Sequence, residues 1–114
     1  MAETIFTKIM SGEIPAEIVY QDDHVAAFRD INPQAPQHLL VVPRAVIPTL
    51  NDVTPENSAS VAQIFEALPK IAEQLGFKES GYRAVFNCGP DAHQEVLHIH
   101  LHVLAGRDMT WPPG

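Results

Sequence analysis

The chain has 114 residues, of which 46% are apolar, so it can bury one domain core without disulfides. Its net charge of −7 argues against a nucleic-acid polymer as partner, because such binding depends on Lys and Arg. The single cysteine, Cys88, excludes an internal disulfide and favours a reducing compartment. Residues 1–6 lack the features of a signal peptide, and no apolar run approaches the roughly 18 residues that span a bilayer. We therefore expect a soluble, cytoplasmic, single domain over residues 1–114.

A short helix is predicted near the N-terminus, because its apolar residues recur at a spacing that places them on one face. Gly12 is its expected stop, and the apolar residues are Ile5, Phe6, Ile9 and Met10. Three strands follow. The first two form a hairpin, and the third follows a proline-rich loop and ends at Pro43. These strands are expected over residues 17–21, 24–29 and 38–42.

One long helix is predicted from Thr54, which can cap it, to Gly76, which can close it. Its apolar stripe consists of Val61, Ile64, Phe65, Leu68, Ile71 and Leu75. Pro69 interrupts the pattern, and an interior proline costs about 3 kcal/mol, so we expect a kink or break there. Two more strands, over 81–87 and 96–104, complete an α+β fold with a five-stranded, mostly antiparallel sheet.

Three histidines alternate with apolar residues in the segment His98-Ile99-His100-Leu101-His102-Val103. In a strand, all three imidazoles would share one face, and the apolar residues would enter the core. Packing explains one such histidine easily and three in register poorly. A metal site is the alternative, because His-x-His can supply two zinc ligands, with His38 or His93 as a third. However, His98 and His102 would lie about 13 Å apart along a strand, too far for one ion.

A row of imidazoles suits chemistry at phosphorus. Neutral imidazole is a nitrogen nucleophile near pH 7, because its ordinary pKa is about 6.5. It can attack phosphorus and divide one difficult displacement into two easier ones, while a second histidine protonates the leaving group. His100 has a histidine on each side, so it is the expected nucleophile. This chemistry requires no cofactor and no metal.

The segment His98–Leu104 resembles the histidine-triad motif, His-φ-His-φ-His-φ-φ with φ apolar. Further segments resemble the Hint branch of the histidine-triad (HIT) superfamily, the purine nucleoside phosphoramidases, over almost the whole chain. These segments are residues 5–9, 13–15, 28–36 and 111–114. The resemblance implies a HIT-like fold and a purine nucleotide site. It also implies cleavage of the P–N bond of an AMP–amine conjugate, in which His100 forms a nucleotidyl-histidine intermediate.

The same resemblance assigns roles around the nucleophile. His102 would lie at the phosphate and leaving group, His98 would support the row, and His38 would buttress it. Asp30 would accept hydrogen bonds from the ribose hydroxyls, although Asp is also a favoured turn residue. The base pocket would be walled by Ile5, Phe6, Ile9, Phe28 and Ile31, which on pattern alone are equally well explained as core. The phosphate would lie near Asn87, Gln94 and Glu95.

The family resemblance further implies a homodimer that joins its sheets edge to edge. The tail, residues 105–114, would then reach the partner's active site, with Arg107 and Trp111 as candidate contacts to the leaving group. Two positions depart from the family pattern: Val46 stands where a histidine is common, and His93 where a glycine is common. Both departures leave the nucleophile intact and bear on rate and leaving-group preference.

Two other functions remain open at this point. The chain could be a nucleotide-binding or scaffold module with little turnover, for which the two departures are the best argument. It could also hydrolyse dinucleoside polyphosphates with the same nucleophile. A pure binding module would hold AMP and release no amine, so turnover separates it from an enzyme.

Overall fold

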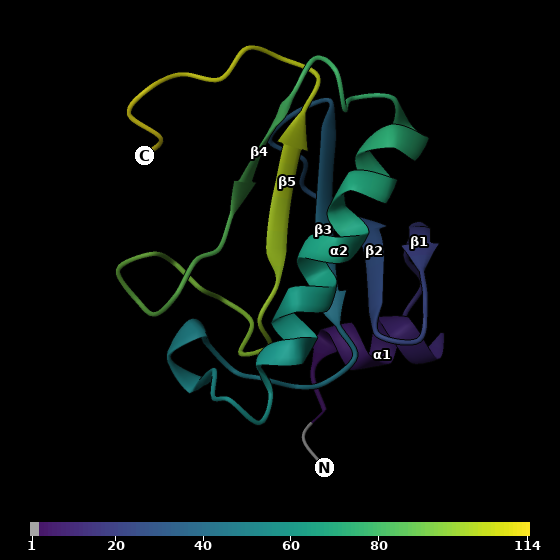
Figure 1. Cartoon of the computed structure of the whole chain (residues 1–114), viewed down its shortest axis with the longest axis vertical. Coiled ribbons are helices and arrows are strands. Elements are labelled where there is room, and N and C mark those ends of the chain that lie inside the picture. The colour runs from purple at the N-terminus through teal and green to yellow at the C-terminus, as the bar shows by residue number, and fades with distance from the viewer. Residues whose placement is uncertain (1–2) are drawn as a thin grey trace.

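A computed structural model describes residues 3–114, so the first two residues of the segment examined for a signal peptide lie outside it. Figure 1 shows how the helices lie against the sheet. In chain order the elements are α1 (Ile5–Ser11), β1 (Ile18–Gln21), β2 (Val25–Arg29), β3 (Gln37–Pro43), the 3₁₀ turn η1 (Leu50–Asp52), α2 (Ser58–Leu75), β4 (Tyr82–Val85) and β5 (Leu101–Ala105). No helix in the described part of the chain is long and apolar enough to cross a membrane.

The sheet has five strands in the order β1-β2-β3-β5-β4, and every neighbouring pair is antiparallel. This arrangement confirms the predicted α+β class, with one long and one short helix. It also makes β3 and β5 direct neighbours at the centre of the sheet, although about 60 residues separate them in the chain. The two central strands therefore bring His38 and His102 together.

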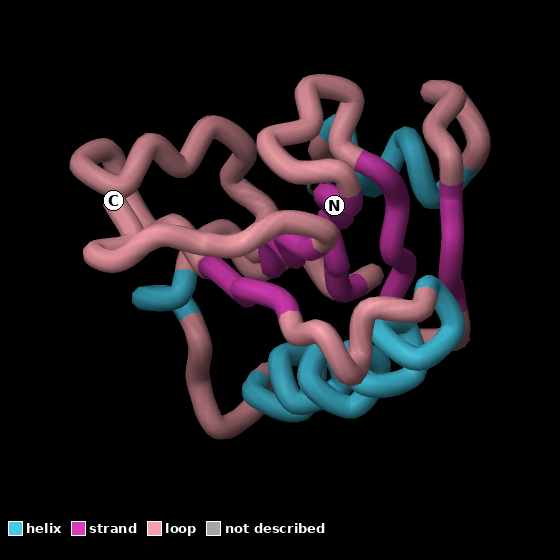
Figure 2. Tube along the Cα trace, turned by 90° about the horizontal axis from the view of Figure 1, so that it is seen from above, coloured by secondary structure: helices cyan, strands magenta, loops and turns pink. Residues whose placement is uncertain are grey.

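The long helix α2 packs across one face of the sheet (Figures 1 and 2). Its buried residues lie 3 or 4 positions apart and meet every second residue of the central strands, as the helix and strand periods require. This core consists of Val25, Ala27, Leu39, Val41, Ile64, Ala67, Leu68, Ile71, Ala72, Phe77, Leu101, Val103 and Ala105.

Two predictions about α2 are wrong. The helix begins at Ser58 rather than near Thr54, because the Asn57 side-chain oxygen accepts the Thr54 N–H at 2.7 Å and closes a separate turn. Pro69 does not break it. Pro69 and Phe65 both lie on the exposed side, so water can reach the Phe65 carbonyl that lacks its usual N–H partner. The predicted end is confirmed: Gly76 adopts a left-handed φ of 82° and donates to the carbonyls of the last turn.

The opposite face of the sheet meets α1, which lies on the other side of the strands from α2 in Figure 2. A second core forms there from Phe6, Ile9, Phe28, Leu40 and Val42. Because side chains alternate along a strand, His38 shares this face with Leu40. His102 projects to the same face, since Leu101 and Val103 enter the α2 core. The fold therefore places both imidazoles beside α1.

The last strand begins five residues later than predicted, at Leu101 instead of residue 96. Val41 pairs with Leu101, so the same antiparallel register would set Ile99 opposite Pro43. Proline has no N–H to give, so the ladder stops at this point. The Ile99 N–H bonds instead to the Ile47 carbonyl at 2.7 Å. His98 and His100 consequently precede the strand, and only His102 lies within it.

Candidate active site

An open cavity of about 450 Å³ lies on the α1 side of the sheet, within the ~300–1,000 Å³ range of small-molecule sites. Segments that are distant in the sequence converge on it: α1, the loop after β2, β3, the loop after β4, and the start of β5. Its lining residues are Ile5, Phe6, Asp30, Ile31, Asn32, Gln34, His38, Leu40, Asn87, His93, Glu95, Val96, His100 and His102. None of these residues is a lysine or arginine.

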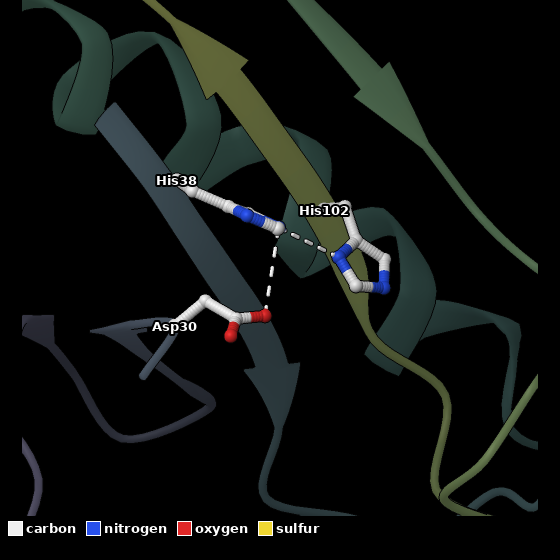
Figure 3. A group of neighbouring side chains, drawn as sticks. All are labelled: Asp30, His38 and His102. Carbon is white, nitrogen blue, oxygen red and sulfur yellow. Dashed lines mark hydrogen bonds and ion pairs between the residues drawn. The ribbon is translucent and has the colours of Figure 1, made fainter. Parts of the chain in front are cut away.

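His38, His102 and Asp30 form one linked group on neighbouring elements (Figure 3). His38 Nδ1 accepts the Gln34 N–H at 3.0 Å, so the neutral ring carries its proton on Nε2. That Nε2–H points toward His102 Nδ1 at 3.0 Å and toward Asp30 Oδ2 at 3.5 Å. Since His102 Nδ1 accepts, the neutral His102 carries its own proton on Nε2. The geometry thus fixes both tautomers.

His100 has the opposite tautomer. Its Nδ1 lies 2.7 Å from the His98 carbonyl oxygen, which can only accept, so Nδ1 carries the proton and Nε2 keeps its lone pair. The ring packs beside Phe6 with centroids 4.8 Å apart, and beside His102 with centroids 5.0 Å apart. A nearly buried imidazole with a bare Nε2 at a cavity wall is the arrangement that a nitrogen nucleophile needs.

His98 does not line the cavity, and the prediction that three imidazoles share one strand face is wrong. The ring is 0% exposed and is bonded at both nitrogens. Nε2 lies 2.7 Å from the Pro43 carbonyl, and Nδ1 lies 2.7 Å from the Thr4 hydroxyl. Because Pro43 O can only accept, Nε2 donates and Nδ1 accepts the Thr4 proton. His98 therefore ties the start of α1 to the end of β3.

Burial keeps this imidazole cluster uncharged near neutral pH. It lowers the pKa of His102 to about 4, with the neighbouring rings of His100 and His38 acting in the same direction. Burial also lowers the pKa of His100, His98 and His38, although Asp30 opposes the effect on His38 and His100. The lowered pKa of His100 therefore favours its neutral form, which is the form that can act as a nucleophile.

Asp30, His38 and His102 could in principle supply three metal ligands, because their nearest ligand atoms lie within 4.8 Å of one another. The hydrogen bonds oppose this. A histidine that binds a metal through Nε2 carries its proton on Nδ1 and needs an acceptor there. His38 Nδ1 instead faces the Gln34 N–H. Asp30, His38 and His102 are therefore better explained as a hydrogen-bonded cluster with fixed proton positions than as a metal centre.

The predicted base wall divides into two groups. Ile5, Phe6 and Ile31 line the cavity, and Ile31 is 96% exposed at its mouth. Ile9 and Phe28 do not line it, because they are buried in the second core behind Phe6. An almost fully exposed isoleucine beside a cavity is poorly explained as core, so the apolar surface here is available to a flat ligand.

Asp30 closes a turn and also lines the cavity. Oδ1 accepts the Asn32 N–H at 2.8 Å and so closes the turn after β2. Oδ2 faces His38, and the carboxylate lines the cavity. One oxygen thus holds the loop while the other remains open to hydroxyl donors of a ligand.

The loop after β4 contributes Asn87 and Glu95 to the cavity lining, but not Gln94, and their role toward a phosphate stays a prediction. The Gln94 side chain holds the loop together instead. Its amide group donates to the Pro48 and Val96 carbonyls at 2.8 and 3.0 Å, and its oxygen accepts the Gly89 N–H at 3.1 Å.

His93 lines the cavity with a positive φ of 60°. It occupies a left-handed conformation that glycine adopts without strain, which agrees with its place at a family glycine position.

Arg107 and Trp111 do not line the cavity. Arg107 donates from Nε and Nη2 to the Gln34 carbonyl at 3.3 and 3.2 Å, so it supports the cavity rim of its own chain. Trp111 is 82% exposed, with the Arg83 guanidinium 6.0 Å from its ring centroid. The structure therefore gives Arg107 a contact within the chain, and the role of both residues toward a partner stays a prediction.

Several residues of the site were not predicted from sequence. Asn32 and Gln34 could have been found, because they lie in the loop that carries the family resemblance. Leu40 shares the strand face of His38, so the period of two pointed to it. The others have no such signal, since their roles depend on chain segments that only the tertiary fold brings together. The missed residues are Thr4, Asn32, Gln34, Leu40 and Val96.

Fold and site together define an α+β protein with an imidazole-lined small-molecule cavity. The HIT domain family model matches residues 11–109, and the chain belongs to the HIT domain family. It is 52% identical to the purine nucleoside phosphoramidase of Escherichia coli K12 over 107 residues, which cover 94% of this chain and 90% of that protein.

Solved structures agree with this family assignment. A HIT family hydrolase from Legionella pneumophila has a TM-score of 0.93 at 52% identity, covering 98% of this chain and all of that one. A histidine triad protein from Clostridium difficile has a TM-score of 0.92 at 45% identity, covering 96% and 97% of the two chains.

Proposed function

We propose that this chain is a nucleoside phosphoramidase, a hydrolase that cleaves the P–N bond between a purine nucleoside 5′-phosphate and an amine. The observation that carries the proposal is His100, whose Nδ1–H is bonded to the His98 carbonyl so that Nε2 presents a lone pair at the cavity wall. The 52% identity to a purine nucleoside phosphoramidase supports the same reaction class.

In the first step, His100 Nε2 attacks phosphorus, and the bond from phosphorus to the amine nitrogen breaks. The amine departs with a proton from His102 Nε2, the donor beside the nucleophile. A neutral imidazole cannot lose its remaining proton near pH 7, so His102 donates from its imidazolium form. The anionic phosphate of the bound substrate raises the pKa of this ring and so favours uptake of the second proton. In the second step, water attacks the nucleotidyl-histidine, returns the proton to His102 and releases AMP.

The rest of the cavity suits a nucleotide. Ile5, Phe6 and Ile31 offer apolar surface for the flat base, and Asp30 offers a carboxylate oxygen for the ribose hydroxyls. Asn87 and Glu95 line the cavity on the loop that the Gln94 side chain holds together, and this loop is where the proposal sets the phosphate. The same set of groups supports AMP as a product ligand.

A homodimer is part of the proposal. Strand β4 is an edge strand, paired with β5 alone, and the nearby Phe65 and Trp111 are large and exposed. A second copy could pair at this edge and cover these groups, with the tail of residues 105–114 directed to the partner. Sedimentation velocity tests this directly, since the proposal requires a mass of two chains. A cytoplasmic location stays a prediction.

The decisive experiment measures release of a fluorescent amine from an adenosine 5′-phosphoramidate by wild type and by His100→Ala. We expect turnover by the wild type and a loss of at least about 10⁴-fold in the variant, as for other covalent nucleophiles. Trapping a nucleotidyl group on His100 by rapid acid quench would identify the intermediate.

Other outcomes would support the alternatives. A wild-type protein that binds AMP but releases no amine is a nucleotide-binding module. Faster cleavage of a dinucleoside polyphosphate than of the phosphoramidate would make the chain a polyphosphate hydrolase instead.

A further inference from the structure

Thr4, the residue before α1, contacts a histidine of the triad in addition to capping the helix. Its side-chain oxygen accepts the backbone N–H groups of Phe6 and Thr7, each at 3.2 Å, which is ordinary N-terminal capping of a helix. The same oxygen lies 2.7 Å from His98 Nδ1, 94 residues away in the chain. The cap is thus also a partner of the histidine triad.

The direction of each hydrogen bond follows from which atoms can donate a proton and which can only accept one. A hydroxyl has one proton and two lone pairs. The two backbone N–H groups occupy the lone pairs of Thr4, so its proton is left for His98 Nδ1. His98 Nε2 donates to the Pro43 carbonyl at 2.7 Å. The buried ring is therefore neutral, with one nitrogen bonded to α1 and the other to the end of β3.

This arrangement matters because of where β5 begins. The His98 carbonyl accepts the His100 Nδ1–H at 2.7 Å, and that bond sets the tautomer of the nucleophile. Residues 98–100 precede the strand, so no ladder holds this carbonyl. What fixes it is the Ile99 N–H bond to Ile47 and the two bonds of the His98 ring. Phe6, which Thr4 caps, packs on both imidazoles, with centroids 5.7 and 4.8 Å away.

We propose that Thr4 is a positioning residue of the active site: its hydroxyl proton holds His98 in the neutral, Nε2-protonated form, and His98 in turn holds the His100 nucleophile. The inference rests on the proposed function and names a residue of its machinery. It also states a chemical requirement. Asp is as good a helix cap as Ser or Thr, but an aspartate has no proton to offer His98. At this position a hydroxyl residue satisfies both the helix and the imidazole from one oxygen atom, whereas an aspartate satisfies only the helix.

The test uses variants that separate the two duties of Thr4. Thr4→Ser keeps the cap and the proton. Thr4→Asp keeps the cap, but its carboxylate can be satisfied only if His98 Nδ1 gains a proton. His100 is the titratable group that faces His98, and it opposes a charge on that ring. Thr7→Ala is the matched control, because it removes the reciprocal bond of the cap to Thr4 and leaves the contact between Thr4 and His98 in place.

Three readouts are taken on each variant. Nitrogen-15 NMR of the imidazole rings reports which His98 nitrogen carries a proton, without any need for turnover. Steady-state kinetics with the phosphoramidate separate kcat from KM, and urea unfolding gives the stability. We expect Thr4→Ser to behave as wild type in all three. Thr4→Asp should show a doubly protonated His98 at pH 7 and a kcat lowered by at least about 10-fold, since small misplacements of reacting groups cost up to about 100-fold.

Thr7→Ala should lose stability and keep its kcat and its His98 spectrum. If Thr4→Asp instead has the wild-type His98 spectrum and kcat, the inference is overturned. It is also overturned if Thr7→Ala, at a similar loss of stability, shows the same loss of kcat as Thr4→Asp. Failure of the proposed function has a different signature, because the wild type itself would then not cleave the phosphoramidate, while the NMR comparison would still report on Thr4 and His98.

Discussion

Acidification should destabilise this protein in a way that can be assigned to one side chain, His102. Its pKa falls from 6.5 in an unfolded chain to about 4 in the fold, chiefly through burial. Below pH 6.5 the His102 ring therefore binds a proton in the unfolded state but stays neutral in the folded state. The free energy of unfolding decreases as pH falls from about 6.5 and levels off near pH 4, whereas above pH 7 the ring is neutral in both states and contributes nothing.

The size of the effect follows from the two pKa values. A depression from 6.5 to about 4 corresponds to about 3 kcal/mol in full, and about 2 kcal/mol of this appears between pH 7 and 4.5. Part of the ring faces the cavity, so these figures are upper bounds. His100, His98 and His38 add to the loss in the same direction, because burial also lowers their pKa values.

The assay is urea unfolding at pH 7 and pH 4.5, on wild type and His102→Asn. Asparagine removes the titrating ring, and its side-chain oxygen can still accept the His38 Nε2–H. We expect the variant to lose less stability on acidification than the wild type, by up to about 2 kcal/mol. His24→Gln, which removes an exposed imidazole in the turn before β2, should stay closer to the wild-type behaviour. Equal losses in wild type and His102→Asn would refute the burial argument.

Three further outcomes are expected. EDTA should leave phosphoramidate turnover unchanged, because the Gln34 N–H keeps His38 from binding a metal with Asp30 and His102; loss of activity would make the cluster a metal site. Asp30→Asn should raise KM for a ribonucleotide substrate on the order of 10-fold and leave KM for its 2′,3′-dideoxy analogue nearly unchanged, so equal effects on both would contradict ribose recognition. His93→Val should be less stable than His93→Gly by about 1–2 kcal/mol in urea unfolding, because φ is 60° at this position; equal stability would show that the loop relaxes.

The elements of the fold were largely predictable because their signals are local. The near-continuous apolar run of residues 38–42 predicts a buried strand, and the spacing from Ile64 to Ile71 predicts a helix, from the local sequence alone. The start of β5 was not predictable, because alternation reports which way side chains point and not where a hydrogen-bonding partner exists. That limit is set by Pro43 on another strand, at a register known only from the folded chain.

In the candidate site, too, some features were predictable from the sequence and others depend on the folded chain. The residue types pointed to His100 as nucleophile, and the family resemblance extended this to Asp30 and His38. The proton positions could not be inferred from sequence, since they depend on which backbone group faces each nitrogen. The pairing of Thr4 with His98 is the clearest example: both residues have ordinary local explanations, and only the tertiary fold brings them within 2.7 Å.

The cavity contains no lysine or arginine but does contain the carboxylates of Asp30 and Glu95, on a protein of net charge −7. A nucleotide therefore approaches against the long-range field, and its capture relies on short-range contacts made after arrival. Added salt, which shortens the Debye length to about 8 Å at 0.15 M, should speed association instead of slowing it. Each additional phosphate on a nucleotide increases the repulsion. The field thus discriminates against di- and triphosphates before any side chain touches them, and this favours ligands in which an amine has neutralised part of the phosphate charge.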